Sequence, residues 1–442
     1  MEEELQVEVK IISKEMVKPS LPPPSHPTTF TLSLLDQIFP LVPPVPLLLF
    51  YSAPTPQSVD INALKLSLSQ SLDYFYPLSG RVHDESIISC NDEGVPFTET
   101  KVNCPLSVFL TSPQKQKSFT KFLPSPELIP LAIQINVFLC GGVVIGTYML
   151  HKFLDANSSA TFLSHWAALA SNRLTDLVHP NFEATVNAFP PLPKIDQDFV
   201  PDLSMVPSTM QSDPSIMIKS FVFSQGSIRD LKAQATSERV PKPTRFEALA
   251  GFIWEQAFAA ATHNLTTEVE HTELFFAVGM RHWLSPPLPK ESMGNLFIPS
   301  VRATTDKSSR LQVMVEKIHL SLSNVQHKIA TVYQGENRVD ALLSDRKAEI
   351  SSPIEFCEGQ YRLTSLCNTS FKETDFGFGK PVRVVHDDGR QPLAMFRNLI
   401  ILTDFTHPIT GDGMVEACIN LEEKDMTILE SNPHFLAFAS PL

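Results

Sequence analysis

The sequence has six cysteines in 442 residues, and none of them stands in a C-x-x-C pair. Structural zinc sites and the disulfide frameworks of small secreted domains both need closely spaced cysteines. The scattered positions argue against both and favour free thiols in a reducing compartment. The chain also has no run of five basic residues, and its formal net charge is −13. This charge argues against a surface for nucleic acid or anionic membranes.

The N-terminal residues MEEELQVEVK lack the basic start and the apolar centre of a signal peptide, so we expect a cytoplasmic protein. One uncharged stretch, residues 128–150, is long enough to imitate a membrane span. It is rich in β-branched residues, and Gln134, Asn136 and a Cys-Gly-Gly break at 140–142 interrupt it. These features favour two buried strands joined by a tight turn over a helix in lipid.

The length of 442 residues exceeds what a single hydrophobic core usually supports, so it predicts two domains. Residues 187–214 contain six prolines and no apolar period, which is typical of a linker. We therefore predict a first domain over 1–186, a Pro-rich crossover linker over 187–214 and a second domain over 215–442.

Several helices and strands are indicated by periodicity and by capping residues. Asp60 is a candidate N-cap for a helix that carries an apolar face and ends before Pro77. Helical spacing returns over 158–170, and a strand is expected over 217–224 with a helix over 227–235. Thr244 and Glu247 have capping-box spacing at the start of a helix over 244–261.

The candidate chemistry begins at His151, which ends the second predicted strand and stands four residues before Asp155. A histidine that is neutral near pH 7 can act as a general base. It can equally be a hydrogen-bonded core residue, and the spacing alone leaves both interpretations open. A metal site is the least favoured, because no H-x-x-x-H or cysteine pair supplies further ligands.

Two other enzyme classes are disfavoured by missing motifs. The chain has no G-x-S-x-G stretch, so a serine nucleophile of the hydrolase type has no support. Residues 375–381, DFGFGKP, contain the D-F-G of kinases, but a G-x-G-x-x-G loop and an H-R-D loop are both absent.

H-x-x-x-D at 151–155 and D-F-G-x-G at 375–379 together resemble the plant BAHD acyltransferases. The resemblance spans nearly the whole chain, because further blocks occur in family order: SLLDQ (33–37), YFYPLSGRV (74–82), CNDEGVPF (90–97), PTRFEALAGFIW (243–254) and MGNLF (293–297). HKFLDA, LTSLCN and the C-terminal GDGMVEACINLEEKDM are most similar to the branch that acetylates alkaloids and related alcohols.

The resemblance implies a fold of two chloramphenicol-acetyltransferase-like α/β domains with a channel at their interface. It implies transfer of an acyl group, acetyl first among the candidates, from acyl-CoA to a hydroxyl of a plant specialised metabolite. His151 is the implied general base. No metal and no cofactor beyond the acyl-CoA co-substrate is implied, and we expect a monomer.

The resemblance also assigns structural residues. Asp155 points away from the substrate and pairs with an arginine, for which Arg281 is the candidate. Asp375, Gly377 and Gly379 are structural and remote from the catalytic histidine, with the glycines permitting unusual backbone conformations.

Coenzyme A carries phosphates, which an acidic protein must meet with a few local donors. Thr244 and Arg245, at the start of a predicted helix, are candidates because backbone N–H groups point outward there. Lys242 is a further candidate. Capping alone explains Thr244 and Glu247 equally well.

One departure from the family pattern affects the acyl pocket. Leu366 stands where a Trp is common near the reacting carbonyl, and leucine donates no hydrogen bond. Thr364 or a backbone N–H is left to stabilise the oxyanion. Leu366 leaves open a catalytically impaired paralogue that only binds ligand. Independently of Leu366, an aromatic or malonyl donor, or an amine acceptor, is the nearest enzymatic alternative.

Overall fold

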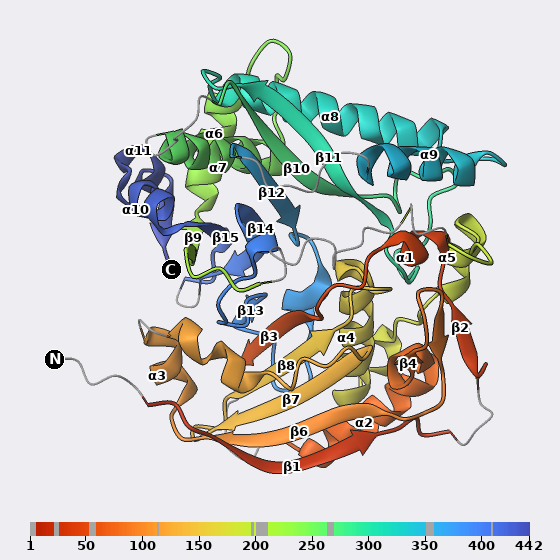
Figure 1. Ribbon diagram of the computed structural model, residues 1–442. Coiled ribbons are helices and arrows are strands. Elements are labelled where there is room, and N and C mark those ends of the chain that lie inside the picture. Colours follow the sequence, from red (N-terminus) through yellow and green to blue (C-terminus); the bar gives the residue numbers. More distant parts are fainter. Residues whose placement is uncertain are drawn as a thin grey trace. The chain divides into compact units, whose positions relative to one another are not determined.

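The computed structural model describes residues 6–21, 26–52, 59–112, 115–195, 199, 211–262, 269–350, 358–407 and 410–442. These residues divide into two compact units, each with its own sheet (Figure 1). The first unit consists of the described residues within Met1–Pro201, Leu288–Leu296 and Thr369–Arg390. The second consists of those within Asp202–Pro287, Phe297–Asn368 and Gln391–Leu442.

The first unit is built on a six-stranded sheet in the order β1 (Val9–Val17), β6 (Val95–Val102), β7 (Leu131–Phe138), β8 (Val143–Met149), β3 (Val45–Tyr51), β13 (Arg383–Val385). All neighbours are antiparallel except β6 and β7. A small second sheet has the order β2 (Thr29–Thr31), β5 (Ile87–Ser89), β4 (Arg81–Val82). The helices are α1 (Leu34–Ile38), α2 (Ile61–Tyr74), α3 (Leu106–Thr111), α4 (Ala156–Ala170) and α5 (Phe182–Ala188), with the 3-10 helices η1 (Tyr76–Ser79), η2 (Lys115–Phe122), η3 (Leu174–Asp176) and η7 (Ser370–Glu373).

Both faces of this sheet are covered, which explains the uncharged run at 128–150. On one face Leu49 and Ile145 pack with Trp166 of α4. On the other face the alternate residues Phe50 and Val144 pack against α3 and η2. Strands buried on both faces are expected to be apolar throughout rather than alternating. The prediction of two strands is confirmed by β7 and β8, and among the described residues no helix is long and apolar enough to cross a membrane.

The predicted capping of the helices in the first unit is borne out. Asp60 caps α2, where its Oδ1 accepts the N–H groups of Asn62 and Ala63. The helix expected over 158–170 begins two residues earlier, because Asp155 accepts the N–H of Ser158 and acts as its N-cap.

The second unit contains a seven-stranded sheet in the order β11 (Phe297–Asp306), β10 (His271–Gly279), β12 (Gln360–Ser365), β14 (Leu399–Thr406), β15 (Gly413–Glu422), β9 (Ile216–Phe223), β16 (Ala439–Pro441). Its helices are α6 (Gln225–Ala235), α7 (Arg245–Thr262), α8 (Leu311–Thr331), α9 (Arg338–Ile350), α10 (Glu423–Ser431) and α11 (Pro433–Leu436), with the 3-10 turn η8 (Ala394–Phe396). The predicted strand near 217–224 and both predicted helices are present as β9, α6 and α7. The capping box also forms, because Glu247 N–H donates to Thr244 Oγ1 and Thr244 N–H donates to Glu247 Oε2.

The first division between the units, after Pro201, falls within the predicted linker 187–214. The prediction of two continuous domains is wrong, because each unit is made of three segments of the sequence. The segment that carries D-F-G-F-G belongs to the first unit and not to the C-terminal one. Its strand β13 pairs with β3, and Phe376 and Phe378 pack in the core beside α4. Of the predicted linker 187–214, residues 187–188 end α5, whereas 196–198 and 200–210 lie outside the described residues.

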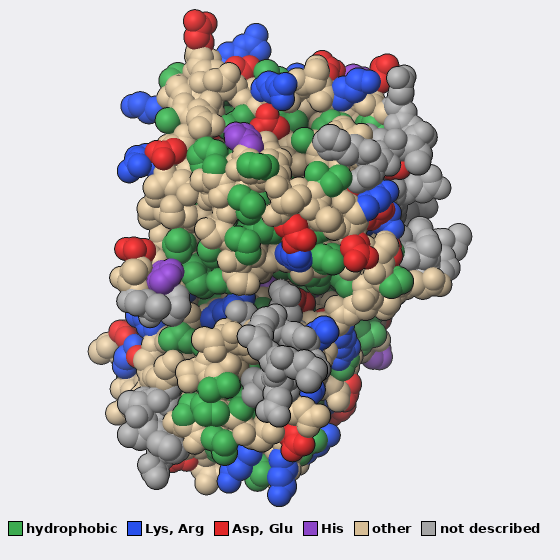
Figure 2. All heavy atoms as spheres, turned by 90° about the vertical axis from the view of Figure 1, so that its left-hand side faces the viewer, with side chains coloured by type: hydrophobic (Ala, Val, Ile, Leu, Met, Phe, Trp, Pro, Cys, Tyr) green, Lys and Arg blue, Asp and Glu red, His purple; other side chains and the backbone are tan. Residues whose placement is uncertain are grey.

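Charged side chains of both signs are spread over the face shown in Figure 2, where Lys and Arg are interleaved with Asp and Glu. Hydrophobic side chains appear between them in small groups. The face drawn there therefore carries side chains of mixed charge.

Candidate active site

His151 lies just beyond the C-terminal end of β8, a central strand of the first unit's sheet. Four residues later Asp155 caps α4, so the H-x-x-x-D motif forms the turn that joins this strand to this helix. A side chain at such a turn is held by regular structure on both sides. The position therefore suits a residue whose orientation must be fixed.

The His151 imidazole is oriented by Asn295. Its Nδ1 lies 3.1 Å from Asn295 Oδ1, while the Asn295 amide nitrogen donates to the backbone oxygens of His151 and Lys152, both at 2.9 Å. Because the amide nitrogen is used by two carbonyls, Oδ1 is the acceptor that faces the ring, and Nδ1 must be the donor. The neutral imidazole then carries its lone pair on Nε2.

The surroundings keep this imidazole neutral. Burial lowers the pKa of His151 below the usual value of 6.5, against the opposing effects of its hydrogen bonds and of the charge on Asp155. The Phe39 ring stacks on the imidazole with a centroid separation of 4.7 Å and an interplanar angle of 24°. A neutral imidazole with an oriented Nε2 can accept a proton near pH 7.

Asn295 is itself held by α1 and by the glycine that precedes it. Its backbone N–H donates to Asp36 Oδ1 at 2.8 Å, and Asp36 Oδ2 accepts a hydrogen bond from the Ser33 hydroxyl at 2.6 Å. Gly294 has a φ of +125°, and a Cβ there would lie 3.0 Å from Thr185 Cγ2 and 3.2 Å from Asp36 Oδ2. The close packing explains why glycine stands before Asn295.

Asp155 uses both carboxylate oxygens to hold backbone. Oδ1 accepts from the Ser158 N–H and hydroxyl, both at 2.8 Å, and Oδ2 accepts from the Leu296 N–H at 3.2 Å. The Ser158 hydroxyl also accepts the N–H of Gly294 at 3.1 Å. Asp155 therefore fastens the start of α4 to the segment that presents Asn295, which is an anchoring arrangement.

Two further charged groups lie buried behind the histidine. Burial raises the pKa of Asp36 to about 6, and the hydrogen bond from Ser33 opposes this rise. Lys152 is fully buried, and its ammonium donates to Gln37 O, Phe39 O and Glu85 Oε2. The histidine thus lies beside a network of buried hydrogen bonds and charges.

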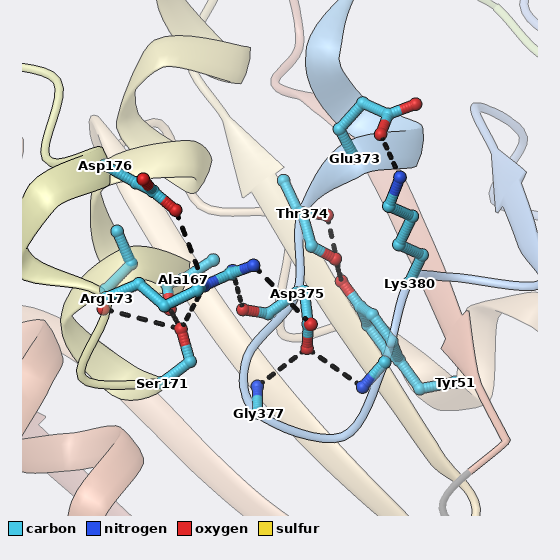
Figure 3. A network of polar contacts seen from close by, with 12 residues as sticks. Tyr51, Ala167, Ser171, Arg173, Asp176, Glu373, Thr374, Asp375, Gly377 and Lys380 are labelled. Atoms are coloured by element: carbon cyan, nitrogen blue, oxygen red, sulfur yellow. Dashed lines mark hydrogen bonds and ion pairs between the residues drawn. The ribbon is translucent and has the colours of Figure 1, made fainter.

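The D-F-G-F-G loop makes a different set of contacts (Figure 3). Asp375 Oδ1 accepts the N–H groups of Gly377 and Gly379 at 2.8 and 2.9 Å, and Arg173 donates to the Asp375 backbone oxygen at 2.6 Å. Both glycines have φ near +97°, a region that side-chain-bearing residues disfavour. The carboxylate closes its own loop against η3 and the end of α4.

The candidate phosphate ligands lie at the start of α7 in the second unit. Thr244 N–H and hydroxyl both donate to Glu247 Oε2, and the Arg245 guanidinium donates to Asp404 at 3.0 Å and to Asn368 at 3.3 Å. Lys242 is exposed. Thr244 and Arg245 therefore already have protein partners, whereas the Lys242 side chain faces solvent.

The candidate oxyanion residues lie at the C-terminal end of β12. Thr364 is paired with Ile401 of β14, and the Leu366 N–H donates to Leu402 O at 2.8 Å. The backbone donor of Leu366 is therefore engaged in the protein. Of the two residues named for this role, Thr364 retains a hydroxyl on its side chain.

Arg281 is buried, with 7% of its surface exposed, and belongs to the second unit, whereas Asp155 belongs to the first. The pairing of these two residues stays a prediction. Within the described residues, no group of three or more His, Cys, Asp or Glu could hold a metal ion.

The residues that surround His151 were not predicted from the sequence. Asn295 was visible only as part of MGNLF, without a role, and Phe39, Lys152 and Asp36 carried no signal of their own. A general base with its lone pair on Nε2 needs an acceptor for Nδ1–H, but nothing in the sequence places position 295 beside position 151.

Comparisons with known proteins identify the family. The model of the Transferase family matches residues 7–436. Akuammiline synthase 2 of Alstonia scholaris is 31% identical over 455 residues, which cover 98% of this chain and 97% of that protein. Stemmadenine O-acetyltransferase of Catharanthus roseus is 32% identical over 446 residues, covering 96% and 97%. The crystal structure of vinorine synthase matches with a TM-score of 0.80 at 28% identity over 98% of this chain and 99% of that one, which confirms the predicted α/β fold class. The chain therefore belongs to the Transferase family, as one of the acyl-CoA-dependent BAHD acyltransferases.

Proposed function

We propose that this acyltransferase moves an acetyl group from acetyl-CoA to a hydroxyl of a plant specialised metabolite, such as an alkaloid, with His151 as the general base. The observation that carries the proposal is the hydrogen bond between His151 Nδ1 and Asn295 Oδ1, which leaves the lone pair on Nε2. The name of stemmadenine O-acetyltransferase supports acetyl as the transferred group and a hydroxyl as its acceptor. The resemblance of HKFLDA and LTSLCN to the branch that acetylates alkaloids supports an alkaloid as the acceptor.

The chemistry needs one proton acceptor. Nε2 of His151 takes the proton of the acceptor hydroxyl as that oxygen attacks the thioester carbonyl carbon. The carbon–sulfur bond then breaks, and the coenzyme A thiolate leaves and takes the proton from the imidazolium. Positioned general-base catalysis of this kind contributes about 10²–10⁴-fold to the rate.

A covalent enzyme intermediate has no support from the residues near His151. Such a route needs a Ser or Cys within hydrogen-bond reach of the base. Cys140 is the cysteine closest to His151 in sequence, but it lies in the turn before β8, at the opposite end of that strand. Both substrates are therefore bound together when the acyl group moves.

For the coenzyme A phosphates, Lys242 and the outward N–H groups at the start of α7 are the proposed contacts. Arg245 contributes by donating hydrogen bonds to Asp404 and to Asn368. Asn368 stands two positions after Leu366 in the sequence. Thr364 is the proposed side-chain donor to the oxyanion. We also expect a cytoplasmic monomer, which light scattering on the purified protein can check for its oligomeric state.

Two alternatives keep the same fold. Another acyl donor or an amine acceptor would use the same base. Leu366, in place of the common Trp, is the observation that favours a catalytically impaired ligand-binding paralogue.

The test is to incubate the purified protein with acetyl-CoA, malonyl-CoA or an aromatic acyl-CoA and a panel of alcohols and amines, following the release of free thiol. The proposal expects release with acetyl-CoA and an alcohol, and intersecting double-reciprocal lines when both substrates are varied. Ligand binding without thiol release for any pair identifies the impaired paralogue. Parallel lines, together with an acetyl adduct on the intact protein, would overturn the role of His151.

A further inference from the structure

Lys152, the residue after His151, has no exposed surface at all. A fully buried lysine is rare, because removing the ammonium from water is costly unless it is paired. Here the ammonium has three acceptors, which are Gln37 O at 3.2 Å, Phe39 O at 2.8 Å and Glu85 Oε2 at 2.5 Å. The ammonium therefore has an acceptor for each of its three N–H groups.

The Lys152 ammonium lies at the C-terminal end of α1. The last carbonyl groups of a helix have no partner within the helix, and a cation near them is favourable. Lys152 supplies donors to Gln37 O inside α1 and to Phe39 O just after it. The ammonium thus fixes the backbone from which the Phe39 side chain extends.

The Phe39 ring in turn contacts the base. It stacks on the imidazole at 4.7 Å and 24°, so it limits the plane in which the His151 ring can lie. Asn295 limits the rotation within that plane, because it accepts the hydrogen bond from Nδ1. These two restraints together determine where Nε2 points.

Lys152 takes part in both restraints. Its ammonium fixes the backbone of Phe39, and its backbone oxygen accepts from the Asn295 amide at 2.9 Å. The charged groups facing the ammonium are Glu85, Asp84 and Asp36, and the Glu85 side chain is 46% exposed. Glu85 is therefore the counter-ion of Lys152 whose side chain is also in contact with solvent.

We propose that Phe39 and Lys152 are positioning residues for acyl transfer, which hold the His151 ring so that Nε2 meets the acceptor hydroxyl. This inference rests on the proposed general-base role of His151. A misdirected base slows the proton transfer but leaves the binding of acyl-CoA unchanged, because neither residue is assigned to the acyl-CoA site.

The test compares Phe39→Leu, Phe39→Tyr, Lys152→Met and Glu85→Gln, with Tyr74→Leu and Lys65→Met as matched controls in the same unit. Tyr74 is a ring packed on the imidazoles of His165 and His179, and Lys65 pairs with Glu15 at 2.7 Å. The measurements are kcat, the KM for acetyl-CoA, the pH profile of kcat/KM and the melting temperature.

Phe39→Leu is expected to lower kcat about tenfold with an unchanged KM for acetyl-CoA. It should also move the acid limb of the profile upward, because the ring that excludes water from the imidazole is lost. Phe39→Tyr keeps the stacked ring and should restore both. Lys152→Met should lower kcat and the melting temperature, and Glu85→Gln should lower kcat less. The controls should change only the melting temperature.

A folded Phe39→Leu protein with the parent's kcat and the parent's acid limb overturns the inference, as does a control that reproduces its pH shift. His151→Ala in the same assay separates this failure from that of the proposed function. If His151→Ala is inactive while Phe39→Leu is unaffected, only the positioning role is wrong. A 15N titration of labelled His151, assigned by its absence in His151→Ala, follows the pKa and tautomer without turnover. An unchanged 15N titration in both Phe39→Leu and Lys152→Met overturns the inference even if no acceptor is found.

Discussion

The two sequence motifs lie in the same unit, and each contains an aspartate that accepts backbone hydrogen bonds. Asp155 holds the start of α4 and the Leu296 N–H, whereas Asp375 holds Gly377 and Gly379 within its own loop (Figure 3). In both motifs the aspartate is an anchor.

The difference lies in what each anchor holds. The H-x-x-x-D turn carries an imidazole whose Nδ1 is engaged and whose contacts come from positions as distant as 39 and 295. The D-F-G-F-G loop holds mainly its own backbone, with Arg173 as a neighbour. We interpret the H-x-x-x-D turn as catalytic because its anchored backbone presents a titratable atom in a fixed direction. We interpret the D-F-G-F-G loop as structural because its aspartate mainly holds the backbone of its own loop.

The largest expected effect comes from His151→Ala. Acyl transfer should fall by about 10²–10⁴-fold while the protein stays folded, because the base is lost and its partly buried site is only slightly enlarged. Thiol release and circular dichroism measure the two properties. His83→Ala, an exposed histidine of the same unit, is the control. Equal kcat in a folded His151→Ala protein contradicts the mechanism.

Asn295→Ala should lower kcat about 10- to 100-fold, because the ring can then take the other tautomer. The pH profile of kcat/KM sharpens the test. In the parent the acid limb should lie below pH 6.5, because burial lowers the pKa of His151. The Asn295 hydrogen bond raises that pKa, so its loss should move the limb to still lower pH. A limb that moves upward would rule out this account.

Asp155→Ala should lower both stability and activity. It removes the N-cap of α4 and leaves the Leu296 N–H without this acceptor, and losses of this kind cost about 2–3 kcal/mol together. Thermal unfolding and residual activity are the measurements. If the melting temperature is unchanged and activity falls as far as in His151→Ala, Asp155 belongs to the catalytic pair and the comparison of the two motifs fails.

Asp375→Ala should lower stability by about 1–2 kcal/mol, because the N–H groups of Gly377 and Gly379 lose their acceptor. The acid limb of the pH profile should stay at the parent's position, since Asp375 makes no contact with the imidazole. The measurement is the melting temperature together with the profile. A shifted limb at this position would break the distinction between the loops.

Asp36→Asn is expected to have the smallest effect on activity. It should instead change how the stability of the protein depends on pH. The pKa of Asp36 is raised from 3.8 to about 6, so the folded state holds this proton more tightly than the unfolded chain. The stabilisation is present below about pH 4 and is lost as the pH rises through 6, amounting to at most about 3 kcal/mol. When the pH is lowered from 7 to 4.5, the melting temperature of the parent should therefore rise relative to that of Asp36→Asn. An equal difference at both pH values would count against the raised pKa.

Much of the local structure could be predicted because its determinants lie a few residues apart. The capping of α2 by Asp60, the capping box of Thr244 and Glu247, and the buried strands β7 and β8 all depend on spacing of this kind. The paired motifs also predicted the family, since H-x-x-x-D and D-F-G-x-G together are specific where each alone is not.

The prediction of two continuous domains was wrong because strand pairing has no local signature. Nothing in residues 383–385 indicates that they hydrogen-bond to β3, more than 300 positions earlier. The burial of Lys152 could not be predicted for a related reason. Lysine is expected at the surface, and only the folded chain supplies its three acceptors.

The sequence by itself determined the regular elements, the family and the identity of the candidate base, because each of these follows from residue type and short spacing. Only the tertiary structure decided how that base is held. The tautomer of His151 depends on Asn295, 144 positions away, and the plane of its ring depends on Phe39, 112 positions away. A hydrogen bond or a ring contact acts over a few ångströms, so it exists only after the chain has brought such distant residues together.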